Sequence, residues 1–233
     1  MTLTDSEREQ LLRESGLAFA GRVTASVTHE LNNVLSTVSE LSGLLEDIAA
    51  AGSLSGALAQ ERLARIATGL TAQVKRGAAI VKRLNRFAHG ADDAIQSVDV
   101  AGLIELIAGL ADPLIRRHEV TLETAIDGAP PVIETNTFVL EQLLYLWIDL
   151  AASASDRTQP ITVSCRPHSS GAEIEIAWYP AQAVEHRSDQ ESLFEVLAQE
   201  LCGAVRTVSG DDGSRHRIIT LPHDTEARAR SAG

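Results

Sequence analysis

The feature that most constrains this chain is a run of apolar residues spaced alternately four and three positions apart. It comprises Val27, Leu31, Val34, Val38, Leu41, Leu45 and Ile48. This spacing puts all the apolar side chains on one stripe of a helix, which is typical of a coiled-coil seam. Thr4 followed by Glu7 fits a capping box, so the predicted helix begins just after Thr4 and continues to about residue 50.

A second amphipathic helix is predicted from about Ala59 to Phe87, after a turn at residues 51–56. Its apolar stripe comprises Leu63, Ile66, Leu70, Val74, Val81 and Leu84. Two such helices joined by a turn form a hairpin that cannot bury its stripe alone. We therefore expect residues 1–92 to pair with a second copy as a homodimeric four-helix bundle.

Residues 97–223 follow a different pattern. Helices are predicted over 100–118, 137–154 and 189–202. Strands are predicted over 120–126, 161–167 and 172–178, with short runs at 204–208 and 217–221. This order predicts an α+β domain, a two-layer sandwich with helices on one face of a mostly antiparallel sheet. The polar residues 224–233 are expected to fray.

Composition disfavours several classes of function. The net charge is −12, from 20 Lys and Arg against 32 Asp and Glu, which disfavours nucleic acid or an anionic membrane as the main partner. We expect a cytoplasmic chain, because no apolar run reaches the roughly 18–20 residues of a membrane span and the acidic start is unlike a signal peptide. Cys165 and Cys202 lack the spacing of a zinc site or a disulfide framework.

Potential chemistry lies on the first helix at His29. If Val27 and Val34 occupy heptad position d, His29 and Asn33 share the outward face and Glu30 lies beside it. An exposed imidazole near a carboxylate can act as a nucleophile, because the carboxylate orients one ring nitrogen and accepts its proton while the other attacks phosphorus. A solitary exposed histidine on a helix is also an ordinary surface residue, so the pattern alone leaves both interpretations open.

The segment His29-Glu30-Leu31-Asn32-Asn33 resembles the H-E-x-x-N phosphoacceptor box of bacterial sensor histidine kinases. The predicted hairpin followed by an α+β domain resembles their dimerisation and ATP-binding domains, so the likeness covers nearly the whole chain. It implies that His29 is phosphorylated, that Glu30 is the general base and that Asn33 assists transfer or dephosphorylation. Many members have proline where this chain has Val34, so the usual helix kink is expected to be weaker.

The second domain lacks the nucleotide-binding signatures of that family. Leu146 and Leu150 stand where its E-Q-x-x-x-N-L-x-x-N-A helix has asparagines, although a one-residue slip would offer Asp149. Trp178 replaces the aspartate of the D-x-G-x-G turn. Residues Glu191–Val196 contain none of the phosphate-loop glycines, and the lid is reduced to Val184–Asp189. We therefore expect no cofactor bound by this chain.

In architecture the chain is similar to histidine phosphotransferases of the ChpT and sporulation-relay type. The resemblance implies that His29 relays a phosphoryl group between receiver-domain aspartates without ATP, and that the receiver supplies Mg²⁺. Receiver binding is expected over Thr28, Asn32 and Ser36, which are small enough to admit it. Two alternatives stay open: a divergent but active sensor kinase, and a non-catalytic receiver-binding dimerisation module.

Overall fold

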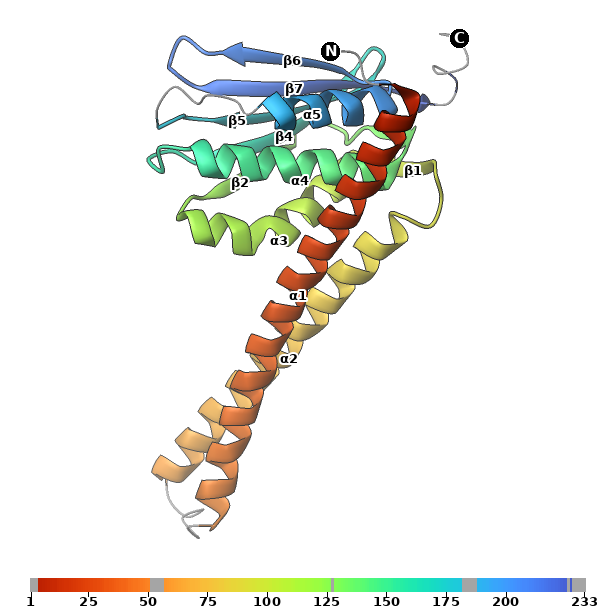
Figure 1. The fold of residues 1–233 in the computed structure, drawn as a ribbon. Coiled ribbons are helices and arrows are strands. Elements are labelled where there is room, and N and C mark those ends of the chain that lie inside the picture. The colour runs from red at the N-terminus through yellow and green to blue at the C-terminus, as the bar shows by residue number, and fades with distance from the viewer. Residues whose placement is uncertain (1–3, 51–56, 127, 182–187, 226, 228–233) are drawn as a thin grey trace. The chain divides into compact units, whose positions relative to one another are not determined.

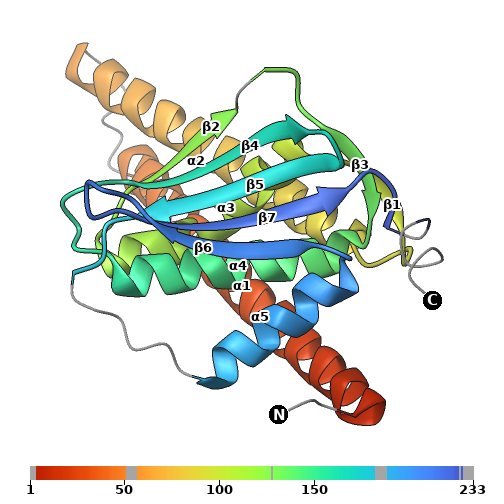
Figure 2. The same ribbon diagram turned by 90° about the horizontal axis from the view of Figure 1, so that it is seen from above.

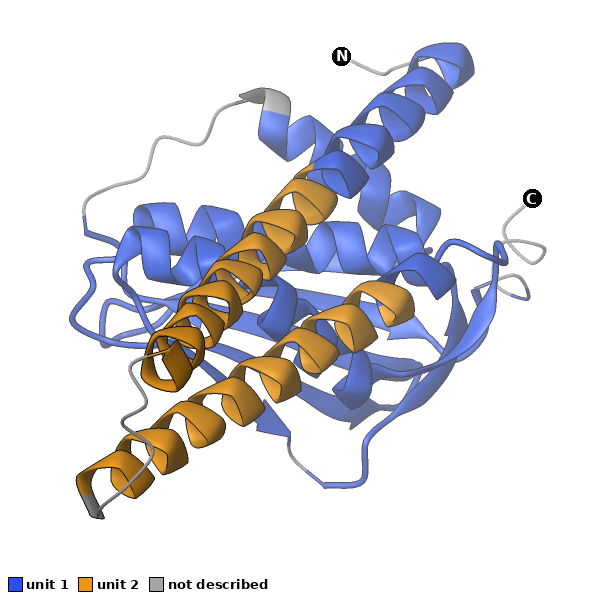
Figure 3. Cartoon of the chain, turned by 90° about the horizontal axis from the view of Figure 1, so that it is seen from below, with its two compact units in different colours: residues 1–21, 87–233 blue, residues 22–86 orange. Residues whose placement is uncertain are grey.

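The computed structural model describes residues 4–50, 57–126, 128–181, 188–225 and 227. Two compact units are distinguished by their contacts, residues 22–86 and residues 1–21 with 87–233 (Figure 3). In chain order the elements are α1 (Asp5–Ala50), α2 (Ala57–His89), β1 (Gln96–Asp99), α3 (Val100–His118), β2 (Leu122–Ile126), β3 (Val132–Thr135), α4 (Thr137–Ala154), β4 (Ile161–His168), β5 (Gly171–Trp178), α5 (Ser188–Glu200), β6 (Ala204–Ser209) and β7 (Arg215–Pro222).

Residues 22–86 form a helical hairpin from the later part of α1 and most of α2. Val27 and Val34 of the predicted seam are buried. A Cβ added at Gly77 of α2 would lie 3.4 Å from Cγ1 of Val34, and one at Gly69 would lie 3.0 Å from Cδ1 of Leu41. The missing side chain at Gly69 therefore lets the two helices approach closely, whereas a methyl group at Gly77 would make ordinary contact with Val34. The predicted turn between the helices, at residues 51–56, lies outside the described residues.

The first four turns of α1 belong to the other unit. The predicted capping box is present, because Oγ1 of Thr4 accepts from the Glu7 N–H at 3.3 Å and the Glu7 carboxylate accepts from the Thr4 N–H at 2.8 Å. Phe19 is buried among three aromatic rings at centroid distances of 5.3–5.5 Å, those of Phe87, Phe138 and Tyr145. Aromatic contacts therefore join this segment to α4.

The α+β unit has a five-stranded sheet in the order β2-β4-β5-β7-β6. The β2–β4 pair is parallel and the other three pairs are antiparallel. Helices α3, α4 and α5 cover one face of this sheet, and the other face is open (Figures 1 and 2). The predicted fold class, a helical hairpin followed by an α+β sandwich, is confirmed.

A second sheet of two short strands is absent from the sequence-based prediction. Strand β1 pairs antiparallel with β3, and each has only four residues. Beyond Pro222 the chain continues along this sheet: the Glu134 N–H donates to the carbonyl of His223, and Thr225 is buried with its hydroxyl on Oγ1 of Thr135.

Helix α4 is the core element of the α+β unit. It is long and apolar enough to span a membrane by length and composition, with a mean hydropathy of 1.2 over 18 residues, although the sequence analysis found no such run. Within the fold 78% of the helix is buried, so its apolar residues form the core beneath the sheet.

Candidate functional site

His29 lies in the middle of α1 with its side chain exposed, as the heptad pattern predicts. Asn33, one turn later, places Nδ2 at 3.4 Å from Nδ1 of the imidazole. An amide nitrogen can only donate, so in this geometry Nδ1 is the acceptor. The carboxamide of Asn33 is therefore a hydrogen-bond donor to the His29 ring.

Glu30 takes a different position from its neighbour. Its side chain is only 8% exposed, and Oε1 faces Nη2 of Arg76 on α2 at 3.9 Å. Successive residues on a helix point about 100° apart, which turns Glu30 toward the second helix while His29 points to solvent. The structure thus brings His29 and Asn33 together and holds Glu30 against the hairpin interior.

The three residues predicted to receive a partner, Thr28, Asn32 and Ser36, are all exposed on α1. Their side chains are short, so the surface around the imidazole is open to another macromolecule. Arg76 contributes to this site from the second helix. This role depends on how α1 and α2 pair, so no local sequence signal indicates it.

Bulky aromatic side chains stand at or near the positions that align with the nucleotide-binding signatures of the resembled family. Trp178, at the end of β5, is 2% exposed, and Trp147 of α4 is 1% exposed. The ring of Phe194 lies edge-on to that of Trp147, with centroids 6.4 Å apart. The predicted short lid lies outside the described residues over 184–187.

Arg217 of β7 packs against the rings of Trp147 and Phe194. Its guanidinium carbon is 4.8 Å from the ring centroid of Phe194 and 5.5 Å from that of Trp147. Nη2 donates to Oε1 of Glu191 at 2.5 Å. A cation stacked on aromatic faces is attracted by their negative π clouds. In place of a glycine loop that could receive phosphates, the start of α5 therefore supplies a carboxylate that binds a buried arginine.

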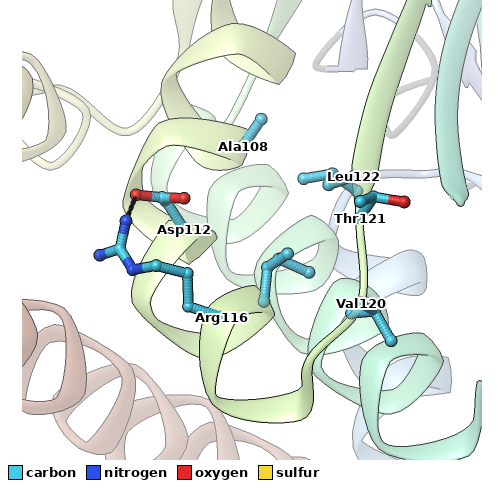
Figure 4. Close-up of a pocket in the computed structure, with 7 residues that line it drawn as sticks. Ala108, Asp112, Arg116, Val120, Thr121 and Leu122 are labelled. Carbon is cyan, nitrogen blue, oxygen red and sulfur yellow. Dashed lines mark hydrogen bonds and ion pairs between the residues drawn. The ribbon is translucent and has the colours of Figure 1, made fainter. Parts of the chain in front are cut away.

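A pocket of about 300 Å³ lies elsewhere in this unit, between α3 and the edge strand β2 (Figure 4). Its walls are mainly aliphatic, and Asp112 and Arg116 form an ion pair at its rim. This volume is at the small end for ligand sites. Among the described residues no group of three or more His, Cys, Asp or Glu could hold a metal ion.

The open face of the sheet carries polar networks that sequence reasoning missed. Burial alone would raise the pKa of Glu173, but hydrogen bonds from Arg166 and Arg206 lower it overall. At the β6–β7 turn, hydrogen bonds from the Ser214 hydroxyl and N–H and from Tyr179 lower the pKa of Asp212 to about 2. The pairs of Glu173 with Arg166 and Arg206 link different strands, so they depend on the sheet pairing and no local sequence signal reveals them.

Comparisons with known proteins point to sensor and histidine kinase chains. No protein-family model matches. The C4-dicarboxylate transport sensor protein DctS of Rhodobacter capsulatus is 23% identical over 146 residues, 61% of this chain and 21% of that protein. The chain thus spans about a fifth of that relative's length.

Two solved structures are also similar. The Acinetobacter baumannii histidine kinase AdeS has a TM-score of 0.48 at 14% identity, over 84% of this chain and 98% of that chain. A bacterial phosphotransferase has a TM-score of 0.45 at 13% identity, over 94% of this chain and 98% of that chain.

Proposed function

We propose that this chain is a histidine kinase-like protein of two-component signalling that works as a phosphotransferase. It relays a phosphoryl group between receiver-domain aspartates through His29 and does not use ATP. The observation that carries the proposal is the exposed imidazole of His29 in mid-helix, with a carboxamide on Nδ1 and a carboxylate on the next residue. Such a ring is accessible to a bulky donor, and a carboxylate that can serve as its base lies on the adjacent residue.

The proposal that the chain does not use ATP is supported by the burial of Trp178 and by the packing around Arg217. Adenine recognition in the resembled family requires a carboxylate where this chain has a buried indole. Opening a site there would expose two tryptophans and unpair Arg217 from Glu191. Each of these changes is unfavourable, so the phosphoryl group is expected to come from another protein.

A homodimer is supported by the residues that one hairpin leaves exposed. Val27 and Val34 are buried, with Val34 beside Gly77 of α2, whereas Leu31 and Val38, on the same seam, are only half-buried. Exposed apolar side chains extend this uncovered stripe on both helices: Leu35 is 62% exposed, Val74 63% and Val81 43%. A second hairpin would cover the stripe and complete a four-helix bundle.

The expected partners are receiver domains in the cytoplasm, which would dock over Thr28, Asn32 and Ser36. Mg²⁺ would come from the receiver's acidic site, because a phosphoryl group in transfer needs its charge neutralised. In the step itself, Nε2 of His29 forms the N–P bond while the P–O bond to the aspartyl carboxylate breaks. The electron pair leaves with that carboxylate.

The proposal is tested by mixing the chain with a panel of receiver domains phosphorylated with acetyl phosphate. We expect acid-labile, base-stable label on the chain within minutes, and none when the chain is incubated with ATP and Mg²⁺ alone. Label from ATP would instead indicate a divergent kinase. Receiver binding without any label would indicate a non-catalytic docking module.

A further inference from the structure

We infer that Arg76 is a positioning residue for His29. By holding the carboxylate of Glu30 against α2, it keeps that carboxylate away from the imidazole, so that Nδ1 of the ring accepts a hydrogen bond from the carboxamide of Asn33. The kinetic part of this inference rests on the proposed phosphotransfer. The part that concerns the imidazole alone does not.

The carboxylate of Glu30 is nearly buried. A carboxylate that is 8% exposed loses most of its hydration and requires a compensating cation. Arg76 supplies that cation from the neighbouring helix, and its own side chain is 49% exposed. The pair thus connects a nearly buried base to a side chain that a partner can reach.

The hydrogen bond from Asn33 determines the tautomer of the imidazole. Because the Asn33 amide donates to Nδ1, the neutral ring carries its proton on Nε2. The lone pair needed for attack at Nε2 is then occupied by that proton, so His29 is at rest. If Glu30 turns to accept from Nδ1–H, the proton moves to Nδ1 and the Nε2 lone pair becomes available.

The position of Glu30 and the tautomer of His29 are coupled through Arg76. Glu30 cannot pair with Arg76 across the hairpin and also bind the imidazole on the outward face. Arg76 therefore selects between the resting and the nucleophilic tautomer. During transfer the Nδ1 proton passes to Glu30 while the N–P bond forms and the aspartyl carboxylate leaves. A phosphorylated receiver is strongly anionic and would draw Arg76 away from Glu30 as it docks.

The test measures the imidazole directly, by ¹⁵N NMR of the full chain labelled at histidine. His29→Gln identifies the His29 signals. We expect the wild-type ring proton on Nε2 and a shift of population toward Nδ1 in Arg76→Ala. Arg76→Lys keeps the cation and should retain the wild-type tautomer, whereas adding Glu30→Gln to Arg76→Ala should restore it.

Arg65→Ala is the matched control. Arg65 lies eleven residues before Arg76, on the same face of α2, and pairs with Glu61 on its own helix at 3.7 Å. Its loss removes an equal charge but should leave the His29 tautomer unchanged. Arg76→Gln, which keeps most of the side-chain length, replaces Arg76→Ala if circular dichroism shows lost helix.

The kinetic arm follows label uptake from a phosphorylated receiver, which we expect to be about three- to tenfold faster in Arg76→Ala, in proportion to the competent tautomer. An unchanged tautomer or slower uptake in that variant overturns the positioning role. If the tautomer responds as expected but the wild-type chain takes no label, the phosphotransfer proposal fails and the positioning role of Arg76 stands.

Discussion

The guanidinium carbon of Arg217 lies 4.8 Å from the ring centroid of Phe194, inside the α+β unit. Strand β7 and helix α5 are thereby joined by a buried cation, the adjoining Trp147 is almost fully covered, and Trp178 at the end of β5 is also buried. In the proposed function this packed interior takes the place of a nucleotide site, because opening it would expose these rings and the cation.

The first prediction is that ATP does not bind. Calorimetry with ATP and Mg²⁺ should show only the heat of dilution, and the fluorescence of the two buried tryptophans should not change. A dissociation constant of about 1 mM or tighter would contradict the account of the filled site.

The second prediction concerns the Arg217–Glu191 pair. The Nε and Nη1 atoms of Arg217 are buried with no hydrogen-bond partner in the described part of the chain. Removing the carboxylate in Glu191→Ala should therefore destabilise the protein by ~2 kcal/mol, because the cation is left buried. The double variant Arg217→Met with Glu191→Gln should recover most of that loss. Urea unfolding measures both, and equal losses in the two variants would rule out a buried-cation penalty.

The third prediction concerns the glycines between α1 and α2. Gly69→Leu should destabilise the hairpin by about 1–3 kcal/mol, because the added Cβ alone would lie 3.0 Å from Cδ1 of Leu41, so the new side chain must displace Leu41. Gly43→Ala is the matched control on α1, since no atom lies within 4 Å of its added Cβ. It should stabilise the helix by about 0.5–1 kcal/mol. If both substitutions stabilise the chain in thermal unfolding, the close packing at Gly69 is wrong.

The fourth prediction tests the dimer. Val74→Glu with Val81→Glu should give a folded monomer in sedimentation, because both side chains are exposed in one hairpin and covered only in the bundle. The control is Lys75→Glu with Lys82→Glu. Each lysine follows one of the two valines and points about 100° away from it round the helix, so this variant should remain dimeric although its charge changes more. A monomeric wild type at micromolar concentration would refute the bundle.

The fifth prediction is a pH dependence at Asp212. Its pKa falls from an ordinary 3.8 to about 2 in the folded chain. A lowered pKa means that the unfolded chain takes up the proton first. The stability that Asp212 contributes is therefore complete above about pH 4 and lost as the pH falls toward 2. Urea unfolding should show this loss as a free energy of unfolding that falls more steeply with decreasing pH in wild type than in Asp212→Asn. In Ser214→Ala, which lacks one of the hydrogen bonds to Asp212, the loss should be smaller. A stability difference that is constant from pH 2 to 6 would exclude it.

The sequence predicts much of this fold because its long elements carry their own periodicity. The seam from Val27 to Ile48 and the Leu-rich stretch of α4 both repeat at helical spacing, and Ser169-Ser170-Gly171 marks the hairpin between β4 and β5. Strands β1 and β3 escape prediction because each has four residues, of which only Val98 in β1 and two alternate residues in β3 are buried. Four residues are too few for an alternating pattern to stand out.

The candidate site is predictable only in part. Heptad position fixes the outward direction of His29 and Asn33, and the motif names Glu30. That the carboxylate of Glu30 turns toward Arg76 depends on how α1 and α2 pair, which no spacing within one helix can specify. The same holds for Arg217, whose aromatic partners come from two helices distant in sequence.

The central claim is that His29 carries the phosphoryl group, and the most direct measurement is the acid-labile phosphate on His29→Ala against wild type after mixing with a phosphorylated receiver. The account predicts label on wild type and none on His29→Ala, with the oligomeric state unchanged because His29 is exposed. Glu30→Gln should slow uptake by roughly 100- to 10,000-fold, the range for a lost general base. If His29→Ala carries as much acid-labile phosphate as wild type, the site and the proposed function are both wrong.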